Sequence, residues 1–294
     1  MGHIPVLLQK VIDLMNLRPG STIVDATFGG GGHSAEILNW IMPGGKLVAF
    51  DKDEAAEERV DEMAKKFGEN FLFINEDFRH MTTMLKERNI HKIDGALFDL
   101  GMSSFHIDDP NRGFSFLTDG PLDMRFDKRH TLSTKDIINR YSKADIADII
   151  RNYGEERYAN IIAGRICDAR RKKQITTTAE LADIIKNAVG WKYRGQKIHP
   201  AARSFQALRI FVNDELTAAE EGINAAMNMM NSGARICVIS FHSLEDRIVK
   251  NIFRGRAKDG GFKLITKKPL VPDDDEIKMN SRARSAKLRV AERV

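Results

Sequence analysis

The residues best suited to do chemistry lie in the segment STIVDATFGGGGH, positions 21–33, with Asp51 as a distant partner. Residues 22–24 form a short apolar, β-branched run, which predicts a buried strand ending at Asp25. Four consecutive glycines, residues 29–32, follow, and the apolar spacing of residues 34–41 predicts a helix after them. In such a unit, backbone N–H groups and the helix N-terminus face a bound ligand.

Asp51 supplies a carboxylate at the next strand. Residues 46–50 (KLVAF) are apolar and predict a second strand that ends at this aspartate. A carboxylate at the tip of the neighbouring strand can accept hydrogen bonds from ribose hydroxyls. The segment and Asp51 together predict a ligand that contains a nucleoside.

Two interpretations of that ligand are open at this point. Gly30-x-Gly32-x-x-Ala35 and the spacing to Asp51 fit a relaxed dinucleotide pattern, which indicates an NAD(P)-dependent oxidoreductase on a Rossmann fold. Asp25 favours S-adenosylmethionine instead, because a carboxylate ahead of the glycines would repel a pyrophosphate but could hold a methionine ammonium group.

Further acids follow two later predicted strands. Asp77 comes after residues 70–75 and is followed by Phe78, which could cover an adenine ring, and Asp99 ends the apolar run of residues 93–100. In an open α/β sheet the ligand crevice lies outside the carboxyl ends of the strands. We therefore expect four aspartates along one edge of a sheet.

The elements that position these residues belong to an ordinary globular chain. It has 294 residues, 42% of them hydrophobic and 30% charged, and no apolar run long enough to span a membrane. Only two cysteines occur, and with no signal peptide they indicate a cytoplasmic protein. No Cys-x-x-Cys or His-Glu-x-x-His motif occurs, so we expect no metal. The net charge of +5 is compatible with a polyanionic partner.

The alternation of strands and helices is interrupted once. Residues 106–128 have no regular period, and residues 133–189 read as helices begun by capping boxes at Ser133, Ser142 and Thr177. A fifth strand, residues 234–240, resumes the core; the next helix is expected to be capped by Ser243-x-x-Asp246. We predict an α/β core, residues 1–106 and 212–294, with an inserted all-α domain, residues 107–211.

One segment has the composition of an RNA-binding surface. Residues 184–213 contain no acidic residue, and they interleave basic and aromatic side chains. A non-catalytic RNA-binding protein that assists ribosome assembly is a third interpretation, and it predicts salt-dependent RNA binding without methyl transfer. The segment carries Lys186, Lys192, Arg194, Lys197, Arg203 and Arg209 among Trp191, Tyr193, His199, Phe205 and Phe211.

The sequence as a whole resembles the bacterial 16S ribosomal RNA (cytosine-N4)-methyltransferases. The matching stretches span nearly the whole chain in order, and several are long and unusual. They are HIPVLL at 3–8, DATFGGGGHSAEIL at 25–38, DLGMSS at 99–104, DDPNRGFSF at 108–116, GPLDMRFD at 120–127, YGEER at 153–157, HPAARSFQALRIFVNDEL at 199–216, FHSLEDRIVK at 241–250 and RARSAKLR at 282–289.

This resemblance implies a Rossmann-like class I methyltransferase core, a mostly parallel twisted sheet flanked by helices. It implies methyl transfer from S-adenosylmethionine to the exocyclic N4 amine of a cytidine in the decoding region of 16S ribosomal RNA. The implied cofactor contacts are Gly31, Gly32, His33, Asp51, Phe78, Asp99 and the residue at 106. The last is a departure, because the family pattern Ser-Ser-Pro-Gln is replaced by Ser103-Ser104-Phe105-His106.

Asp99 is the candidate catalytic residue, because an acceptor at this strand end can orient the amine and the cofactor. The RNA would be met within the small ribosomal subunit or an assembly intermediate, by a protein that is a monomer or a homodimer. Candidate RNA contacts are Phe114, Phe116, Trp191, Lys192, Arg194, Lys197, Arg203 and His242.

Overall fold

Both ends of the chain combine into one unit, and the middle of the chain forms a second. The computed structural model describes residues 5–195 and 198–294, and its two units are Met1–Gly101 with Leu216–Val294, and Met102–Glu215. The boundaries expected from sequence, after residues 106 and 211, lie a few residues inside the second unit. His106 therefore belongs to the second unit and not to the first.

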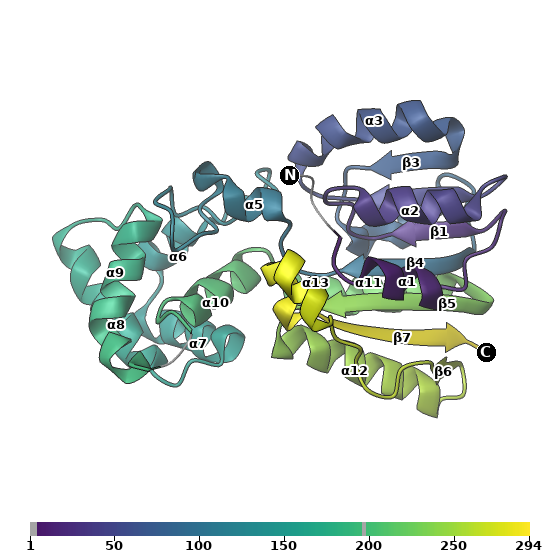
Figure 1. The fold of residues 1–294 in the computed structure, drawn as a ribbon. Coiled ribbons are helices and arrows are strands. Elements are labelled where there is room, and N and C mark those ends of the chain that lie inside the picture. The colour runs from purple at the N-terminus through teal and green to yellow at the C-terminus, as the bar shows by residue number, and fades with distance from the viewer. Residues whose placement is uncertain (1–4, 196–197) are drawn as a thin grey trace. The chain divides into compact units, whose positions relative to one another are not determined.

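The first unit is built on a seven-stranded sheet with the order β3-β2-β1-β4-β5-β7-β6 (Figure 1). The five strands β1 to β5 are parallel, whereas β7 runs antiparallel to both β5 and β6. The sheet is mostly parallel, as in a Rossmann-like α/β core, so the predicted fold class is confirmed. The strands are β1 (Thr22–Asp25), β2 (Lys46–Phe50), β3 (Phe71–Ile74), β4 (Ile93–Asp99), β5 (Met230–Ser240), β6 (Phe262–Leu264) and β7 (Lys287–Arg293).

Helices cover both faces of this sheet, which explains why the parallel strands are almost wholly apolar. Alternate strand residues enter different cores: Val24 belongs to one hydrophobic cluster, and Ile23 and Leu47 belong to the other. The helices are α1 (Leu8–Leu14), α2 (Gly32–Ile41), α3 (Glu57–Phe67), α4 (Met81–Lys86), α11 (Glu215–Met229), α12 (Ser243–Lys258) and α13 (Asp274–Met279).

The second unit is helical and has its own hydrophobic core, which includes Ile150, Ile162 and Leu208. Capping boxes begin α6, α7 and α9 at Ser133, Ser142 and Thr177, as predicted. The helices are α5 (Ser104–Asp108), α6 (Thr134–Arg140), α7 (Lys143–Gly154), α8 (Ala159–Lys172), α9 (Thr178–Val189) and α10 (Ala202–Val212). Short 3-10 helices are Glu54–Ala56, Gly68–Asn70, Phe78–His80, Pro110–Arg112, Gly190–Tyr193 and Ser281–Ser285.

The cap of α12 differs from the prediction. The N-cap residue is His242, whose side chain accepts a hydrogen bond from the backbone N–H of Glu245. Asp246 instead pairs with Arg289 of β7, at 2.7 Å between Oδ1 and Nε. Arg289 thus binds the carboxylate that the local sequence pattern assigned to the helix cap.

Within the two described stretches of chain, no helix combines the length and the apolar composition that crossing a membrane requires.

Candidate functional site

The carboxyl edge of the parallel strands gathers the acids that the sequence predicted. Asp25 and Asp99 are the last residues of β1 and β4, and Asp51 directly follows β2. Asp77 follows β3 after a short turn and caps the 3-10 helix Phe78–His80. Because β3, β2, β1 and β4 are consecutive neighbours, the four side chains stand along one edge.

Asp25 organises the loop between β1 and α2. Its Oδ2 accepts a hydrogen bond from the Ser34 hydroxyl at 2.7 Å, and its Oδ1 accepts one from the Thr27 N–H at 3.0 Å. Burial raises the pKa of Asp25 to about 6, against the opposing effect of these hydrogen bonds. Asp25 therefore joins the strand end to the helix, and both of its oxygens are engaged inside the protein.

The glycines allow the loop to turn tightly into α2. Gly31 is the N-cap residue and has a φ of 75°, in the left-handed region that favours glycine. A Cβ on Gly31 would lie 2.9 Å from Cζ of Phe28, and one on Gly32 would lie 2.3 Å from Cγ of Pro5. The backbone here is thus as close to its neighbours as a glycine permits, and Gly31 offers no side chain to cap the helix.

Asp51 connects the loop to β2. Its Oδ2 accepts from the Gly29 N–H at 2.8 Å, and its Oδ1 accepts from the Asp53 N–H at 2.9 Å. The side chain of Asn75 donates to the Asp51 carbonyl oxygen at 3.0 Å. These bonds fix the carboxylate beside the glycine loop, where the sequence placed a ribose-binding acid.

Asp77 differs from the other acids because cations surround it. Lys52 Nζ lies 3.3 Å and Arg79 Nε 3.4 Å from its Oδ2. Burial acts to raise the pKa of Asp77, but these two charges and the Arg79 N–H outweigh it and hold the pKa below its usual value. Phe78, next to it, is half-buried and packs edge-on against Phe98 at 5.4 Å between ring centroids.

Asp99 is the least satisfied of the four acids. Its backbone N–H donates to the Thr27 hydroxyl at 2.7 Å, but among the residues that the structure describes no group donates to its buried Oδ1. Its Oδ2 lies 3.7 Å from Nδ1 of His33. Burial, and then the charges of Asp25 and Glu245, raise the pKa of Asp99 to about 8.

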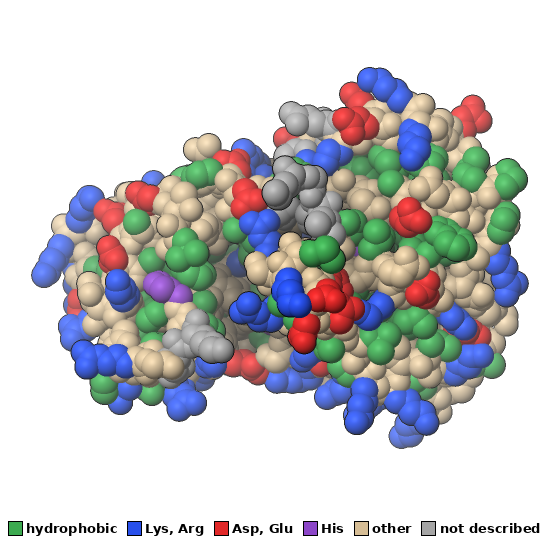
Figure 2. Space-filling model, viewed as in Figure 1, with side chains coloured by type: hydrophobic (Ala, Val, Ile, Leu, Met, Phe, Trp, Pro, Cys, Tyr) green, Lys and Arg blue, Asp and Glu red, His purple; other side chains and the backbone are tan. Residues whose placement is uncertain are grey.

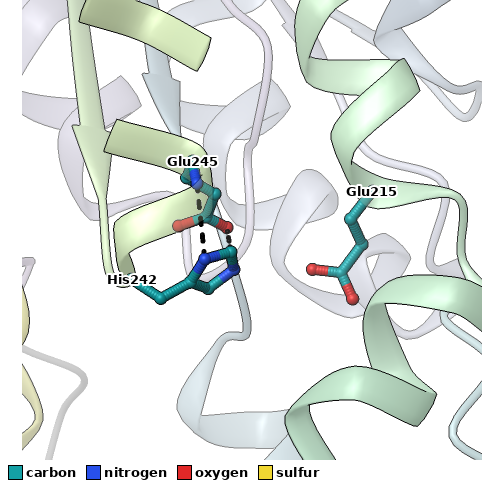
Figure 3. Close-up of side chains that lie close together, drawn as sticks. All are labelled: Glu215, His242 and Glu245. Atoms are coloured by element: carbon teal, nitrogen blue, oxygen red, sulfur yellow. Dashed lines mark hydrogen bonds and ion pairs between the residues drawn. The ribbon is translucent and has the colours of Figure 1, made fainter. Parts of the chain in front are cut away.

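Glu245 is a site residue that the sequence did not single out. It is 2% exposed, its Oε2 accepts from the Phe241 N–H at 2.8 Å, and its Oε1 lies 3.2 Å from Nε2 of His242 (Figure 3). The available signal was its place in FHSLED, directly after the fifth strand. His242, a candidate RNA contact, is thus largely buried against Glu245, and its Nδ1 serves as the helix cap.

His106 lies in the core of the second unit. Its Nδ1 lies 3.0 Å from the Ser103 hydroxyl and accepts from the Ser103 N–H at 3.2 Å. Its ring packs 4.8 Å from that of Phe126 and 5.4 Å from that of Phe114. A cofactor contact at His106 stays a prediction from the resemblance.

The aromatic candidates for RNA contact separate into buried and exposed residues. Phe114 is 6% exposed and stacks on Phe126, so its ring is buried in the second unit, and an RNA contact there stays a prediction. Phe116 stacks on His199, with 4.9 Å between centroids. Trp191 is 59% exposed, and Lys192 Nζ lies 3.7 Å above its ring.

The basic candidates also differ. Arg194 is exposed, Arg203 donates to the Glu155 carbonyl oxygen at 3.2 Å, and Lys197 lies outside the described residues. Arg209 does not belong to the basic surface, because it is buried and makes two 2.9 Å contacts with the Glu215 carboxylate. The visible face of the helical unit nevertheless carries many Lys and Arg side chains (Figure 2).

Comparisons with known proteins identify the family of this chain. Residues 1–294 match the model of the MraW methylase family. The chain is 44% identical to the ribosomal RNA small subunit methyltransferase H of Finegoldia magna and 43% identical to that of Clostridioides difficile. Each alignment covers 99% of this chain, and they cover 98% and 99% of those proteins, respectively. A Streptococcus mutans protein solved in complex with SAH is similar over 99% of both chains, with 11% identity and a TM-score of 0.46.

Proposed function

Because this chain belongs to the MraW methylase family, we propose that it transfers a methyl group from S-adenosylmethionine to the N4 amine of a cytidine in the decoding region of 16S ribosomal RNA. The names of its relatives, which are small-subunit ribosomal RNA methyltransferases, support the class of substrate. The cytidine and its position are what the family resemblance of the sequence motifs implies. This substrate would place the enzyme in the cytoplasm.

The observation that carries the proposal is the buried Oδ1 of Asp99, to which no group in the described parts of the chain donates. A buried acceptor without a donor costs free energy unless a ligand satisfies it. Its position at the end of β4, beside the β1–α2 loop, fits a ligand that carries an amine or a cation. The residues present therefore fit S-adenosylmethionine, which supplies a methyl group on a positively charged sulfur.

The same edge provides the remaining cofactor contacts that we propose. Gly31 and Gly32 bring the backbone close to the ligand, and Asp51 stands where ribose hydroxyls would be bound. His33 is held by the Val6 carbonyl oxygen, 3.0 Å from its Nε2, with Nδ1 toward Asp99. Phe78 would cover the adenine ring.

Asp99 would act on the substrate by positioning and by charge. The N4 lone pair of cytosine is delocalised into the ring, so the nitrogen is a poor nucleophile. A carboxylate oxygen that accepts a hydrogen from the amine holds the nitrogen in place and stabilises the positive charge that develops on it. No separate strong base is required for this contribution.

The helical unit would present the RNA. Trp191 offers an exposed aromatic face, and Lys192, Arg194 and Arg203 are basic side chains close to it in sequence. Aromatic stacking and phosphate contacts together bind single-stranded nucleic acid. A cytosine exposed by RNA folding, or flipped out of a helix, could then be methylated.

Transfer of a radiolabelled methyl group tests this proposal. The protein is incubated with labelled S-adenosylmethionine and either intact small subunits or naked ribosomal RNA, and the label is mapped to a nucleotide. We expect N4-methylcytidine at a single decoding-region position, with the two substrates distinguishing subunit from free RNA. No label on either substrate, or label elsewhere, would contradict the proposal.

Asp99→Ala should abolish the transfer while the protein still folds, because a ligand contact is removed. The matched control is Asp61→Ala, which removes an exposed aspartate of α3. Full activity of Asp99→Ala would refute the catalytic assignment without affecting the substrate assignment.

A further inference from the structure

Three carboxyl groups lie at the ends of neighbouring strands in the first unit; two of them are buried, and the side chain of the third, Asp99, is 21% exposed. Asp25 ends β1, Asp99 ends β4, and Glu245 follows β5 in the first turn of α12. Asp25 is 1% exposed and Glu245 2% exposed. Three negative charges in such a poorly hydrated place repel one another, so the group with the fewest donors takes up a proton.

The hydrogen-bond donors identify that group. Asp25 receives the Thr27 N–H and the Ser34 hydroxyl, so its charge is stabilised at both oxygens. Glu245 receives the Phe241 N–H and lies against the His242 imidazole. At Asp99, by contrast, Oδ1 is buried without any donor from residues 5–195 or 198–294.

His33, from α2, is a further titratable group that faces Asp99. The Val6 carbonyl oxygen can only accept, so Nε2 of His33, 3.0 Å away, carries a hydrogen. In the neutral ring, Nδ1 then presents a lone pair to Asp99 Oδ2 at 3.7 Å. In its neutral form the ring therefore offers no hydrogen to Asp99.

From this geometry, and resting on the cofactor role proposed above, we propose that Asp99, enclosed beside Asp25 and Glu245 with no donor to its Oδ1, is protonated in the free protein, and that binding of a cationic methyl donor releases this proton. The O–H bond of the Asp99 carboxyl group breaks, and the proton passes to the buffer. The new carboxylate is balanced by the positive charge bound beside it. The ionised oxygen is then the acceptor that the cytosine amine requires.

Calorimetry detects this proton directly and does not depend on methyl transfer. Binding of S-adenosylmethionine to the whole protein is measured near pH 7 in two buffers that differ in ionisation enthalpy, such as phosphate and Tris. The difference in observed heat gives the number of protons released. We expect a release approaching ~1 proton for S-adenosylmethionine and much less for S-adenosylhomocysteine, whose sulfur is uncharged.

Two variants and a control test whether the released proton comes from Asp99. Glu245→Gln removes one of the two neighbouring charges and should lower the release near pH 7, because Asp99 is then more ionised before binding. Asp99→Asn should abolish the release. Glu87→Gln, an exposed control with its side chain 59% accessible, should release as many protons as the wild type.

A wild-type pH series keeps the inference testable even if Glu245→Gln does not fold. The release should fall towards zero above about pH 9, where Asp99 is already ionised in the free protein. Equal heats in both buffers, a release that is constant with pH, or a wild-type release from Glu245→Gln would overturn the inference. Complete failure of the wild type to bind would instead contradict the proposed function on which it rests.

Discussion

The hydroxyl of Ser34 donates to Oδ2 of Asp25 at 2.7 Å, and this bond joins the end of β1 to the first turn of α2. Ser34 is fully buried, and the two residues enclose the glycine loop between them. The bond therefore holds both ends of the loop that would contact the cofactor. It is also one of two donors that stabilise the charge of Asp25.

Ser34→Ala should destabilise the protein and weaken cofactor binding together. The substitution leaves an oxygen of a buried carboxylate without its donor, which costs about 1–3 kcal/mol of the free energy of unfolding. Urea unfolding at pH 7 measures the loss, and calorimetric titration measures the affinity for S-adenosylmethionine. Ser232→Ala, an exposed serine of β5, is the control. Equal stability of the two variants would show that the Ser34 bond contributes nothing.

Gly31→Ala should damage the loop through the backbone. Alanine in the left-handed region costs about 1–2 kcal/mol, and its Cβ would lie 2.9 Å from Cζ of Phe28. We expect a roughly tenfold or larger loss of affinity for S-adenosylmethionine, which corresponds to about 1.4 kcal/mol. Gly255→Ala is a matched control, because a Cβ there meets nothing within 4 Å inside α12. The Gly255→Ala variant should gain about 0.5–1 kcal/mol in stability. Wild-type affinity of Gly31→Ala for S-adenosylmethionine would exclude a close approach of backbone and ligand.

The stability of the free protein should decrease as the pH rises. The pKa values of Asp25 and Asp99 are raised to about 6 and about 8, above the value of about 3.9 for an unfolded aspartate. Between these values the folded state binds more protons than the unfolded state, so the free energy of unfolding falls with pH. Asp99→Asn should remove most of this dependence above pH 6.

Denaturant unfolding of the free protein at pH 5, 7 and 9 measures that effect. Near pH 9 we expect Asp99→Asn to be more stable than the wild type by on the order of 2 kcal/mol, because no charge must be buried. Asp61→Asn, at an exposed position of α3, should follow the wild-type curve. Parallel curves for Asp99→Asn and the wild type would mean that Asp99 ionises normally in the free protein.

The sheet edge could be predicted from the sequence because its determinants are local. Apolar runs such as residues 46–50 mark buried strands, and parallel strands place their carboxyl ends at one edge. The positions of Asp25, Asp51 and Asp99 at this edge could therefore be predicted without any knowledge of their tertiary contacts. The capping boxes of the helical unit followed for the same reason.

The rest depends on contacts between distant residues. The α12 sequence contains two possible capping patterns, offset by one position: His242-x-x-Glu245 and Ser243-x-x-Asp246. Arg289 of β7 binds Asp246, so the first pattern forms the cap. Similarly, nothing in the irregular segment around Phe114 indicates that Phe126 would bury it. The side-chain contacts of Glu245 and Phe114 depend on the tertiary fold, and no local sequence periodicity predicts them.

Trp191→Ala should weaken RNA binding and leave cofactor binding unchanged. Stacking of a base on an aromatic side chain contributes about 1–3 kcal/mol, so we expect a roughly fivefold to hundredfold loss of affinity for a decoding-region RNA fragment. The chain contains only one other tryptophan, Trp40 of α2, which is 52% exposed and donates to Glu36 at 3.0 Å. Trp40→Ala is therefore the control for loss of an exposed indole, and it should bind the fragment as the wild type does.

The same pair of residues provides an optical measurement. In Trp40→Phe the indole of Trp191 is the sole tryptophan fluorophore, and stacking of a base on it should quench the emission as RNA is added. The midpoint of the quenching should shift to higher RNA concentration with added salt, because basic side chains such as Lys192 and Arg194 would contact phosphates. Unchanged emission on saturation with RNA, or equal RNA affinity of Trp191→Ala and Trp40→Ala, would remove Trp191 from the RNA-binding surface.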